Sequence, residues 1–283
     1  MAAFDWYQGT IPHPVADVLE VLAGLAPGLV LSHERGMHGY QSTAVLGNEA
    51  EGSVAKLWHG GTHEHPHAVL SGEWAQPGAQ AIRAAFPVHS VSRLDVREDF
   101  SDVGAYDRIL PFMVDASERY KVKPDCRGDW AVKNNEGRSF YLGATQSAVR
   151  MRLYDKRTEM LSKYATDSDR QLIVRARNIP DQLARLEAQI RPEKKDAKLR
   201  FATIEPIEAL GASRWMREVW RAVAGLELTP VQVGRGYRES DDERARKFML
   251  LHYGGVLRRM HEELGDWACV GLQLGHELGK QKG

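Results

Sequence analysis

Three segments of the chain alternate apolar and polar side chains with a period of two: 91–100, 148–156 and 183–192. Successive side chains of a β-strand point to opposite faces, so each segment is predicted to be a strand with one apolar and one polar face. If the three strands are neighbours in one antiparallel sheet, their polar faces merge into one surface. That surface would carry one tyrosine, at least two carboxylates and several cations, namely Arg93, Asp95, Arg97, Arg150, Arg152, Tyr154, Lys156, Arg185, Glu187, Gln189 and Arg191.

The rest of the pattern predicts a mixture of helices and further strands. Apolar spacing typical of helices occurs at 14–25, 76–86, 103–120, 157–165, 205–224 and 240–264, and strands are predicted at 4–11, 68–74 and 139–142. Segment 29–58 is rich in glycine and turn residues, which predicts antiparallel hairpins. Pro111 is expected to kink or cut its helix, and the polar segment 123–130 is expected to form turns.

The order of these elements indicates the fold class. Strands concentrate before Pro192 and helices after it. This order predicts an α+β fold with an antiparallel central sheet and flanking helices, followed by a C-terminal helical region. The expected division is a domain over 1–225 and a helical region over 226–283, and a chain of 283 residues is long enough for both.

Composition and charge exclude some classes of protein. Hydrophobic residues make up 43% of the chain, but no apolar run approaches the roughly 20 residues of a membrane span. The N-terminal residues lack the pattern of a secretory signal, and Cys126 and Cys269 lie far apart, so we expect reduced thiols in a cytoplasmic protein. The net charge is zero, yet residues 150–200 hold 14 Lys and Arg against 8 Asp and Glu, a net +6 that suits phosphate contacts.

The predicted polar surface suits phosphoryl transfer to a tyrosine. A phenol has a pKa of about 10 and is a poor nucleophile at neutral pH, but nearby cations favour its phenolate. Carboxylate oxygens can hold a divalent ion that polarises a phosphate, and Lys and Arg stabilise the charge that develops on it. The alternative is a set of cross-strand ion pairs on a solvated sheet face, each of which contributes little to stability.

Three motifs resemble those of the rolling-circle replication initiators of small plasmids and filamentous phages, the group called replication initiation factors or Rep_trans. "SRLDVREDF" is similar to that family's R-L-D-x-x-x-D-F strand. "YLGATQSAVRMRLYDKRTE" is similar to its Y-[FIL]-G … R-[IL]-Y-[DN]-K-x-x-E segment, and "ARLEAQIRP" to its R-[FVL]-E-[IV]-[EQ]-[LI]-[KR] strand. Order and approximate spacing agree, so the resemblance covers about residues 4–225.

The resemblance implies an activity and a set of catalytic residues. It implies that Tyr154 attacks one DNA strand at an origin, is joined to the 5′ phosphate, and later allows the strand to be rejoined. Lys156 would hold the phosphate or lower the pKa of the phenol. It also implies a need for Mg²⁺ or Mn²⁺, with Asp95, Glu159, Glu187 and, less directly, Asp99 as ligands. The family's second acid in the third motif is Gln189 here, so Gln189 receives no metal role.

The resemblance also implies partners for the chain. The protein would bind origin DNA as a single strand or as a strand exposed in a hairpin. It would act as a homodimer and load a host helicase, and it would not associate with a membrane. The cations expected to contact DNA are Arg93, Arg150, Arg152, Arg185 and Arg191. Two other hypotheses stay open: a DNA-binding regulator without nicking activity, and a metal-dependent phosphodiesterase that uses water.

Some residues invite other interpretations. His63, His65 and His67, with His59 nearby, could form a metal site on one strand face, but Pro66 interrupts them and a loop is favoured. His89 has the strand parity of Asp95, although a structural histidine is favoured there. Tyr141 and Tyr164 could be mistaken for the nucleophile and are expected to be packing residues.

Overall fold

The computed structural model describes residues 2–49, 51–131, 136–233 and 241–280. The chain divides into two compact units, Met1–Arg235 and Gly236–Gly283. The first unit is an α+β structure with one large antiparallel sheet and flanking helices, as the order of elements predicts. Buried Val231 and Val233 belong to the core of this first unit.

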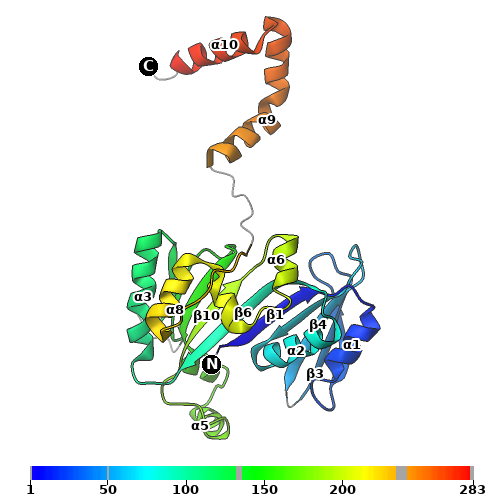
Figure 1. Ribbon diagram of the computed structural model, residues 1–283, viewed down its shortest axis with the longest axis vertical. Coiled ribbons are helices and arrows are strands. Elements are labelled where there is room, and N and C mark those ends of the chain that lie inside the picture. The colour runs from blue at the N-terminus through cyan, green and yellow to red at the C-terminus, as the bar shows by residue number, and fades with distance from the viewer. Residues whose placement is uncertain (1, 50, 132–135, 234–240, 281–283) are drawn as a thin grey trace. The chain divides into compact units, whose positions relative to one another are not determined.

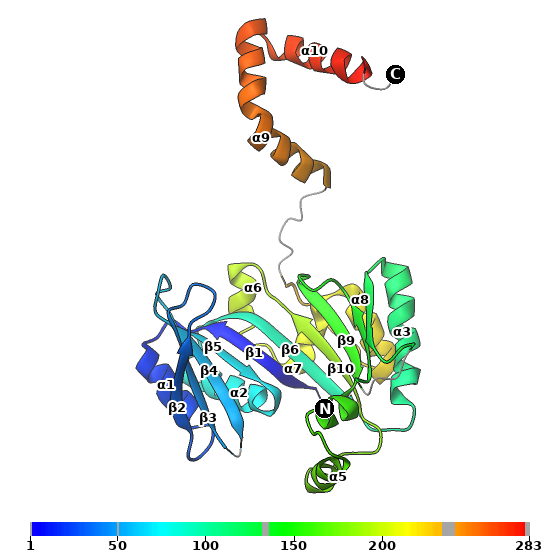
Figure 2. The ribbon, with the colours of Figure 1, turned by 180° about the vertical axis from the view of Figure 1, so that it is seen from behind.

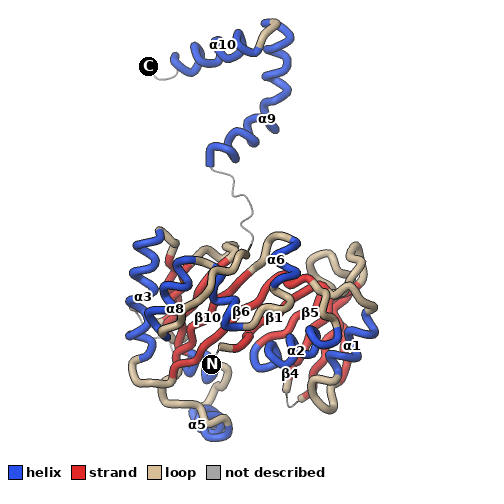
Figure 3. The backbone as a smooth tube through the Cα atoms, viewed as in Figure 1, coloured by secondary structure: helices blue, strands red, loops and turns tan. Residues whose placement is uncertain are grey.

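The strands of the first unit form one continuous sheet (Figure 3). In the described part of the chain the order is β2-β3-β4-β5-β1-β6-β10-β9-β8-β7, and every neighbouring pair is antiparallel. β10 is the last strand in sequence and lies between β6 and β9, although both precede it along the chain. The strand bounds are β1 Ala3–Thr10, β2 Val30–Arg35, β3 Ser42–Asn48, β4 Gly52–His59, β5 His67–Ser71, β6 Ser90–Phe100, β7 Pro124–Gly128, β8 Arg138–Leu142, β9 Val149–Asp155 and β10 Ala184–Ile190.

Helices pack along one face of this sheet (Figure 1). α2 contacts β1 and β5, α3 contacts β8, β9 and β10, and α6 contacts β6. α4 and α5 follow β9 directly along the chain, and α8 packs on α3. The bounds are α1 Val15–Ala23, η1 Gly72–Trp74, α2 Ala75–Ala85, α3 Ala105–Tyr120, α4 Lys156–Leu161, α5 Asp167–Ala176, α6 Lys195–Arg200, α7 Pro206–Ala209, η2 Leu210–Ala212 and α8 Arg214–Ala224.

The apolar faces of the three alternating strands form the centre of the core. Leu94, Met151 and Leu186 are fully buried, and Met113 and Trp220 reach the same core from α3 and α8. Burying one such side chain stabilises the fold by roughly 1.5–3 kcal/mol. One face of β6, β9 and β10 is therefore committed to packing. Figure 2 views these strands from the opposite side, where they lie in front of α8.

Several local predictions differ from the structure. The single helix expected over 205–224 is divided into α7, η2 and α8, because Ser213 has an extended backbone and begins α8 as its N-cap. Segment 123–130 contains the edge strand β7, whose mostly exposed side chains give no apolar alternation. Residues 72–74 form the short 3₁₀ helix η1 and not the end of a strand. Helix α3 continues through Pro111, where the ring is solvent-exposed and only one backbone N–H is missing from the ladder.

The second unit is helical, in agreement with the pattern of the last sixty residues. It contains α9 Asp241–Leu264 and α10 Trp267–Lys280. Ser240, the expected first residue of this helix, and part of the connecting segment 229–240 lie outside the described residues. No helix in the described ranges is long and apolar enough to cross a membrane.

Candidate nucleotidyl-transfer site

The three alternating strands are neighbours in the sheet, in the order β6-β10-β9. Directly opposed residues of antiparallel strands share a face, so the register merges the polar sides into one surface. Its rows run Asp99–Arg185–Tyr154, then Arg97–Glu187–Arg152, then Asp95–Gln189–Arg150. We call these nine residues, together with Arg93, the polar face. The merged surface that alternation predicts is confirmed.

Tyr154 lies on the polar face but is almost completely enclosed. Its side chain is only 3% exposed. The guanidinium of Arg152 lies over its ring at 3.7 Å from the centre, and the Lys156 amine lies at 5.7 Å. Burial raises the phenol pKa far above its usual value, the charges of Glu187 and Asp5 raise it further, and Arg185 and Arg152 only partly oppose this. The cations thus act on the phenol pKa in the expected direction, but burial and the nearby carboxylates outweigh them.

Tyr141 presents a second phenol to the same surface. It stands opposite Arg152 in the β8–β9 pairing, and its side chain is partly exposed. The Arg150 guanidinium lies 4.0 Å from its ring centre and that of Arg152 lies 5.4 Å away. Tyr141 is thus no packing residue, contrary to expectation, but a member of the cationic surface.

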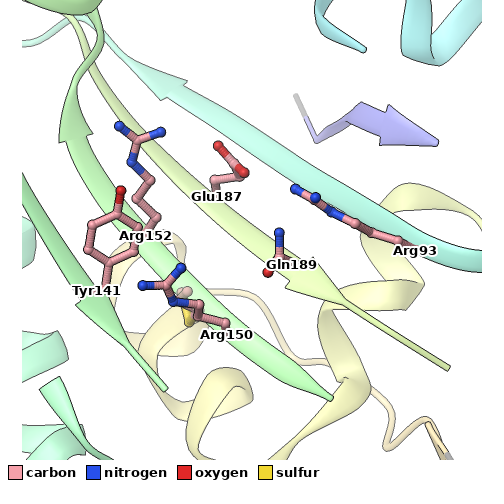
Figure 4. A pocket seen from close by; sticks show the side chains of 7 residues that line it. Arg93, Tyr141, Arg150, Arg152, Glu187 and Gln189 are labelled. Carbon is pink, nitrogen blue, oxygen red and sulfur yellow. The ribbon is translucent and has the colours of Figure 1, made fainter. Parts of the chain in front are cut away.

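A pocket of about 180 Å³ opens on the polar face (Figure 4). Glu187 and Gln189 stand on the middle strand, with Arg93 on one side and Tyr141, Arg150 and Arg152 on the other. Three guanidinium groups, one phenol and one carboxyl group thus converge on one small volume. A phosphate ester fits such a donor set, because Arg forms paired hydrogen bonds with phosphate oxygens.

Asp95 and Glu187 form a close pair of acids beside this pocket. Asp95 is 2% exposed and accepts a bidentate pair of hydrogen bonds from Arg93, whose Nε lies 2.9 Å from Oδ1. Burial, with the nearby charges of Asp95 and Asp5, raises the pKa of Glu187 to about 8. Near neutral pH the pair therefore holds a proton, unless a cation replaces it.

The other two predicted metal ligands are, like Asp95, bound to cations of the protein. Asp99 accepts hydrogen bonds from Arg185 at 2.6 and 2.8 Å and from Arg97 at 2.9 Å. Glu159, in the first turn of α4, pairs with Lys156 at 2.6 Å and with Lys163 at 3.6 Å. The Lys156 amine is therefore paired with Glu159 and also lies 5.7 Å from the centre of the Tyr154 ring.

The predicted DNA-contacting arginines differ in how freely they can meet a ligand. Arg93, Arg150 and Arg152 line the pocket. Arg185 is 5% exposed and is held between Asp99 and Asp5, with an Nη1–Oδ1 distance of 2.8 Å to the latter. Arg191 donates to the backbone oxygen of Thr145 at 2.7 Å and remains partly exposed.

A divalent cation fits part of the proposed ligand set. Mg²⁺ and Mn²⁺ prefer oxygen ligands, and Asp95 and Glu187 offer two adjacent carboxylates. Gln189 adds an amide oxygen, Oε1, that is buried and has no hydrogen-bond partner in the described structure. No group of three or more His, Cys, Asp or Glu within the described ranges is arranged to hold a metal. The fit is thus two acids and, contrary to expectation, the Gln189 amide, without Asp99 and Glu159, and a bound ion would displace the Arg93 pair of Asp95.

Two members of the surface were missed by the sequence analysis. Tyr141 alternates with buried Phe140 and Leu142, so its parity alone could have placed it on the polar face. Asp5 contacts Arg97 at 3.1 Å and Arg185 at 2.8 Å. A β-bulge between Phe4 and Trp6 shifts the register there, so simple alternation along β1 could not have found Asp5.

The histidines lie away from the acid pair. His89 is buried, bonds Tyr7 Oη at 2.6 Å and the Phe86 oxygen at 2.7 Å, and is a structural histidine, as favoured from the sequence. His63 and His65 lie in the loop before β5, and His67 is its first residue. The acid-lined centre of the polar face contains none of them.

Comparisons with known proteins give a structural similarity but no match to a protein family or a curated protein. Among solved structures, the chain is similar to a rolling circle replication initiator protein from Geobacillus stearothermophilus, with 18% sequence identity and a TM-score of 0.48. The similarity covers 74% of this chain and 82% of that one.

Proposed function

We propose that the chain is a rolling-circle replication initiator that cuts and rejoins one strand of origin DNA through a tyrosine. The observation that carries the proposal is the adjacency of the three motif strands. In the order β6-β10-β9, their register brings the Tyr154 phenol, an acid pair and several guanidinium groups onto one face. Each motif alone would be compatible with an ordinary solvated strand.

The reaction is an exchange of one phosphate ester for another. The tyrosine oxygen attacks the phosphorus of a phosphodiester, the bond from phosphorus to the 3′ oxygen breaks, and a 5′-phosphotyrosine forms. The phenol proton leaves to a base or to water, and the departing 3′ oxygen takes up a proton. Rejoining is the reverse, with a 3′ hydroxyl as nucleophile, so the energy of the phosphodiester is retained in the ester.

The chain's own cations would stabilise the charge of this exchange. Arg93, Arg150 and Arg152 surround the pocket, where a phosphate would receive their hydrogen bonds. Arg185 would not contact the phosphate. Its ion pairs with Asp99 and Asp5 would hold the part of the sheet in which Tyr154 stands opposite Arg185. Asp95, Glu187 and Gln189 would hold Mg²⁺ or Mn²⁺, which when bound supplies Lewis-acid stabilisation of phosphate oxygens.

Tyr154 is the proposed nucleophile, because the resembling motif assigns that role to its position. Its ring is buried and lies under the Arg152 guanidinium, so we expect that side chain to move when a phosphate approaches. Arg152 is also a pocket residue, so binding a phosphate would draw it off the ring. Tyr141 is the competing phenol, because it is partly exposed and lines the pocket without such a rearrangement.

A covalent-capture experiment tests the proposal. The protein is mixed with Mn²⁺ and a random pool of hairpin oligonucleotides with single-stranded loops, labelled at either end. A 3′-end label should become attached to the protein on a denaturing gel, and a 5′-end label should be released on a shortened strand. Tyr154→Phe and Tyr141→Phe each remove one hydroxyl, and mass spectrometry of the adduct peptide identifies the attacking residue.

The same experiment separates the other two functions. Cleavage without any protein-bound label would identify water as the nucleophile. Binding without cleavage, in folded protein with Mn²⁺ present, would identify a DNA-binding regulator. The burial of Tyr154 and the pairing of Asp99 and Glu159 with cations are the observations that favour this last alternative.

A further inference from the structure

A group of aromatic rings extends the open face of the sheet beyond the polar face. His67 of β5 stands opposite Thr10 of β1 on one side and Trp58 of β4 on the other. Thr10 has the parity of Trp6 and Gln8, which face Asp95 and Arg93 across the β1–β6 pairing. We define the aromatic cluster as His38, Tyr40, Trp58, His63 and His67.

The rings of this cluster are held in place before any ligand binds. Tyr40 stacks on His63, with centroids 4.0 Å apart and 22° between planes, and Trp58 stacks on His67 at 5.3 Å and 14°. The Thr10 hydroxyl lies 2.8 Å from His67 Nδ1, and His63 Nε2 lies 2.9 Å from the His38 oxygen. A fixed ring surface binds a planar ligand with little further loss of side-chain entropy.

The exposure of the rings leaves them open to a planar partner. His38 and His63 are exposed, and Tyr40 and Trp58 are partly exposed. His67 is 6% exposed, and burial lowers its pKa to about 4, with the charges of His38, His63 and Lys198 acting in the same direction. His67 is therefore neutral at physiological pH and supports Trp58 as a packed ring.

The histidines of the cluster do not form a metal site. In the described part of the chain no three His, Cys, Asp or Glu side chains are arranged to share a metal ion. The geometry consists of ring stacks, whereas metal-binding imidazoles point their nitrogens at one centre. The nearby acids are paired, Glu34 with Lys56 at 3.3 Å and Glu64 with His65 at 3.8 Å.

A cation and a tryptophan connect the cluster to the pocket. The Arg93 guanidinium lies 4.4 Å from the centre of the Trp6 ring, and Arg93 also lines the pocket. Three strand spacings separate β10 from β5, or about 14 Å at about 4.8 Å per strand. At the duplex rise of about 3.4 Å per nucleotide this distance corresponds to about four stacked nucleotides, and an extended strand spans it with fewer. One DNA single strand can therefore contact both the pocket and the aromatic cluster.

We propose that the aromatic cluster is a base-stacking site for single-stranded DNA, several nucleotides from the phosphate that occupies the pocket. The inference rests on the proposed function for the identity of the strand as DNA. Single strands are bound by cations along the backbone and by aromatic rings under the bases, and the stacking tolerates any sequence. The cluster supplies the rings, and Arg93, Arg150 and Arg152 supply the cations.

Binding of a labelled oligo(dT) 12-mer, which needs no cleavage, tests the site. Tyr40→Leu should weaken the affinity roughly tenfold, and Tyr40→Phe, which keeps the ring, should stay within about twofold. Arg93→Ala should flatten the dependence on salt, whereas Tyr40→Leu should leave that slope unchanged, because stacking releases no counterions. His63→Ala, an exposed substitution, should also weaken binding and provides a second variant if Tyr40→Leu fails to fold.

A substitution in the DNA tests the same site with unaltered protein. An oligomer with abasic positions should bind more weakly to the native protein, and Tyr40→Leu should bind both oligomers alike. Native affinity in Tyr40→Leu and His63→Ala would overturn the stacking site, and so would equal affinity for duplex DNA. If Tyr40→Leu and His63→Ala weaken oligonucleotide binding while the native protein forms no covalent adduct with DNA, the stacking site is supported and the proposed nicking activity is overturned.

Discussion

The guanidinium group of Arg152 lies over the Tyr154 ring, 3.7 Å from its centre. The contact keeps the phenol on the polar face out of solvent, while the hydroxyl-bearing ring of Tyr141 beside it is partly exposed. One arginine thus belongs to the pocket and also covers the residue that the motif resemblance names as nucleophile.

Removing the Arg152 side chain should uncover Tyr154. In the native protein, a tyrosine-nitrating reagent should modify Tyr141 well before Tyr154, because only the former is accessible. In Arg152→Ala, nitration of Tyr154 should accelerate severalfold, as followed by peptide mass spectrometry. Arg127→Ala is the matched control, because Arg127 lies 5.2 Å from the Tyr141 ring on the exposed side. If Tyr154 is nitrated at the same rate in Arg152→Ala as in the native protein, the Arg152 side chain does not shield Tyr154 from solvent.

The raised pKa of Glu187 should make stability fall as pH rises. The unfolded carboxyl ionises near pH 4.5, and the folded one near pH 8. Between these values the folded state keeps a proton that the unfolded state has lost, so the free energy of unfolding decreases up to about pH 8 and then levels off. Urea unfolding of native protein and Glu187→Gln at pH 5, 6.5 and 8 should show the steeper decrease in the native protein.

A divalent cation should compete with that proton. Metal ligands must be deprotonated, so Mn²⁺ should raise the melting temperature more at pH 8 than at pH 5.5. Glu187→Gln should lose most of this effect, and Glu159→Gln should keep it, because Glu159 is paired with Lys156 and Lys163. An equal loss in both variants would show that Glu159 also binds the ion.

Arg185 is expected to stabilise the fold and not to contact DNA directly. Its guanidinium is buried between Asp99 and Asp5, and removing one partner of a buried pair costs about 3–5 kcal/mol. Arg185→Met should approach the lower end of this range in urea unfolding, because both carboxylates keep some access to water. Arg191→Met should cost less than about 1 kcal/mol. Native stability with lost DNA binding in Arg185→Met would contradict this role.

The position of the domain boundary can be tested by shortening the chain. A chain ending at Arg235 should unfold near the melting temperature of the first unit in the full protein. A chain ending at Gly225 loses Val231 and Val233, each 7% exposed, and the hydrogen bond from Val231 to Gly211. Two buried valines contribute about 3–6 kcal/mol, so its melting temperature should fall by at least about 6 °C.

The strands of the site could be predicted from the sequence because their alternation is strict. Leu94, Met151 and Leu186 alternate with charged residues, and period two then fixes which side chains share a face. The order β6-β10-β9 did not follow from that pattern, because alternation within a strand contains no information about which distant strand is its neighbour. Adjacency is therefore only a condition of the predicted surface, and it is established by the pairing of β10 with β6 and β9.

Other features of the site depend on contacts that alternation cannot reveal. Asp99 and Glu159 have suitable chemistry for a metal, but Arg185 and Lys156 occupy them in three dimensions. The burial of Tyr154 depends on how the Arg152 side chain lies, and this is set by packing. Tyr141 was predictable, since Phe140 and Leu142 flank it, but it was interpreted as a packing aromatic.

The place of β10 has a consequence for the growing polypeptide. β10 is the last strand to be made, at Ala184–Ile190, and is inserted between two strands that are already complete. Until it arrives, β6 and β9 have no common neighbour, and Asp95 and Tyr154 belong to separate edges. A chain that ends before β10 therefore lacks the merged polar face. This surface is assembled in one late step, after the strands on both sides of β10 have been synthesised.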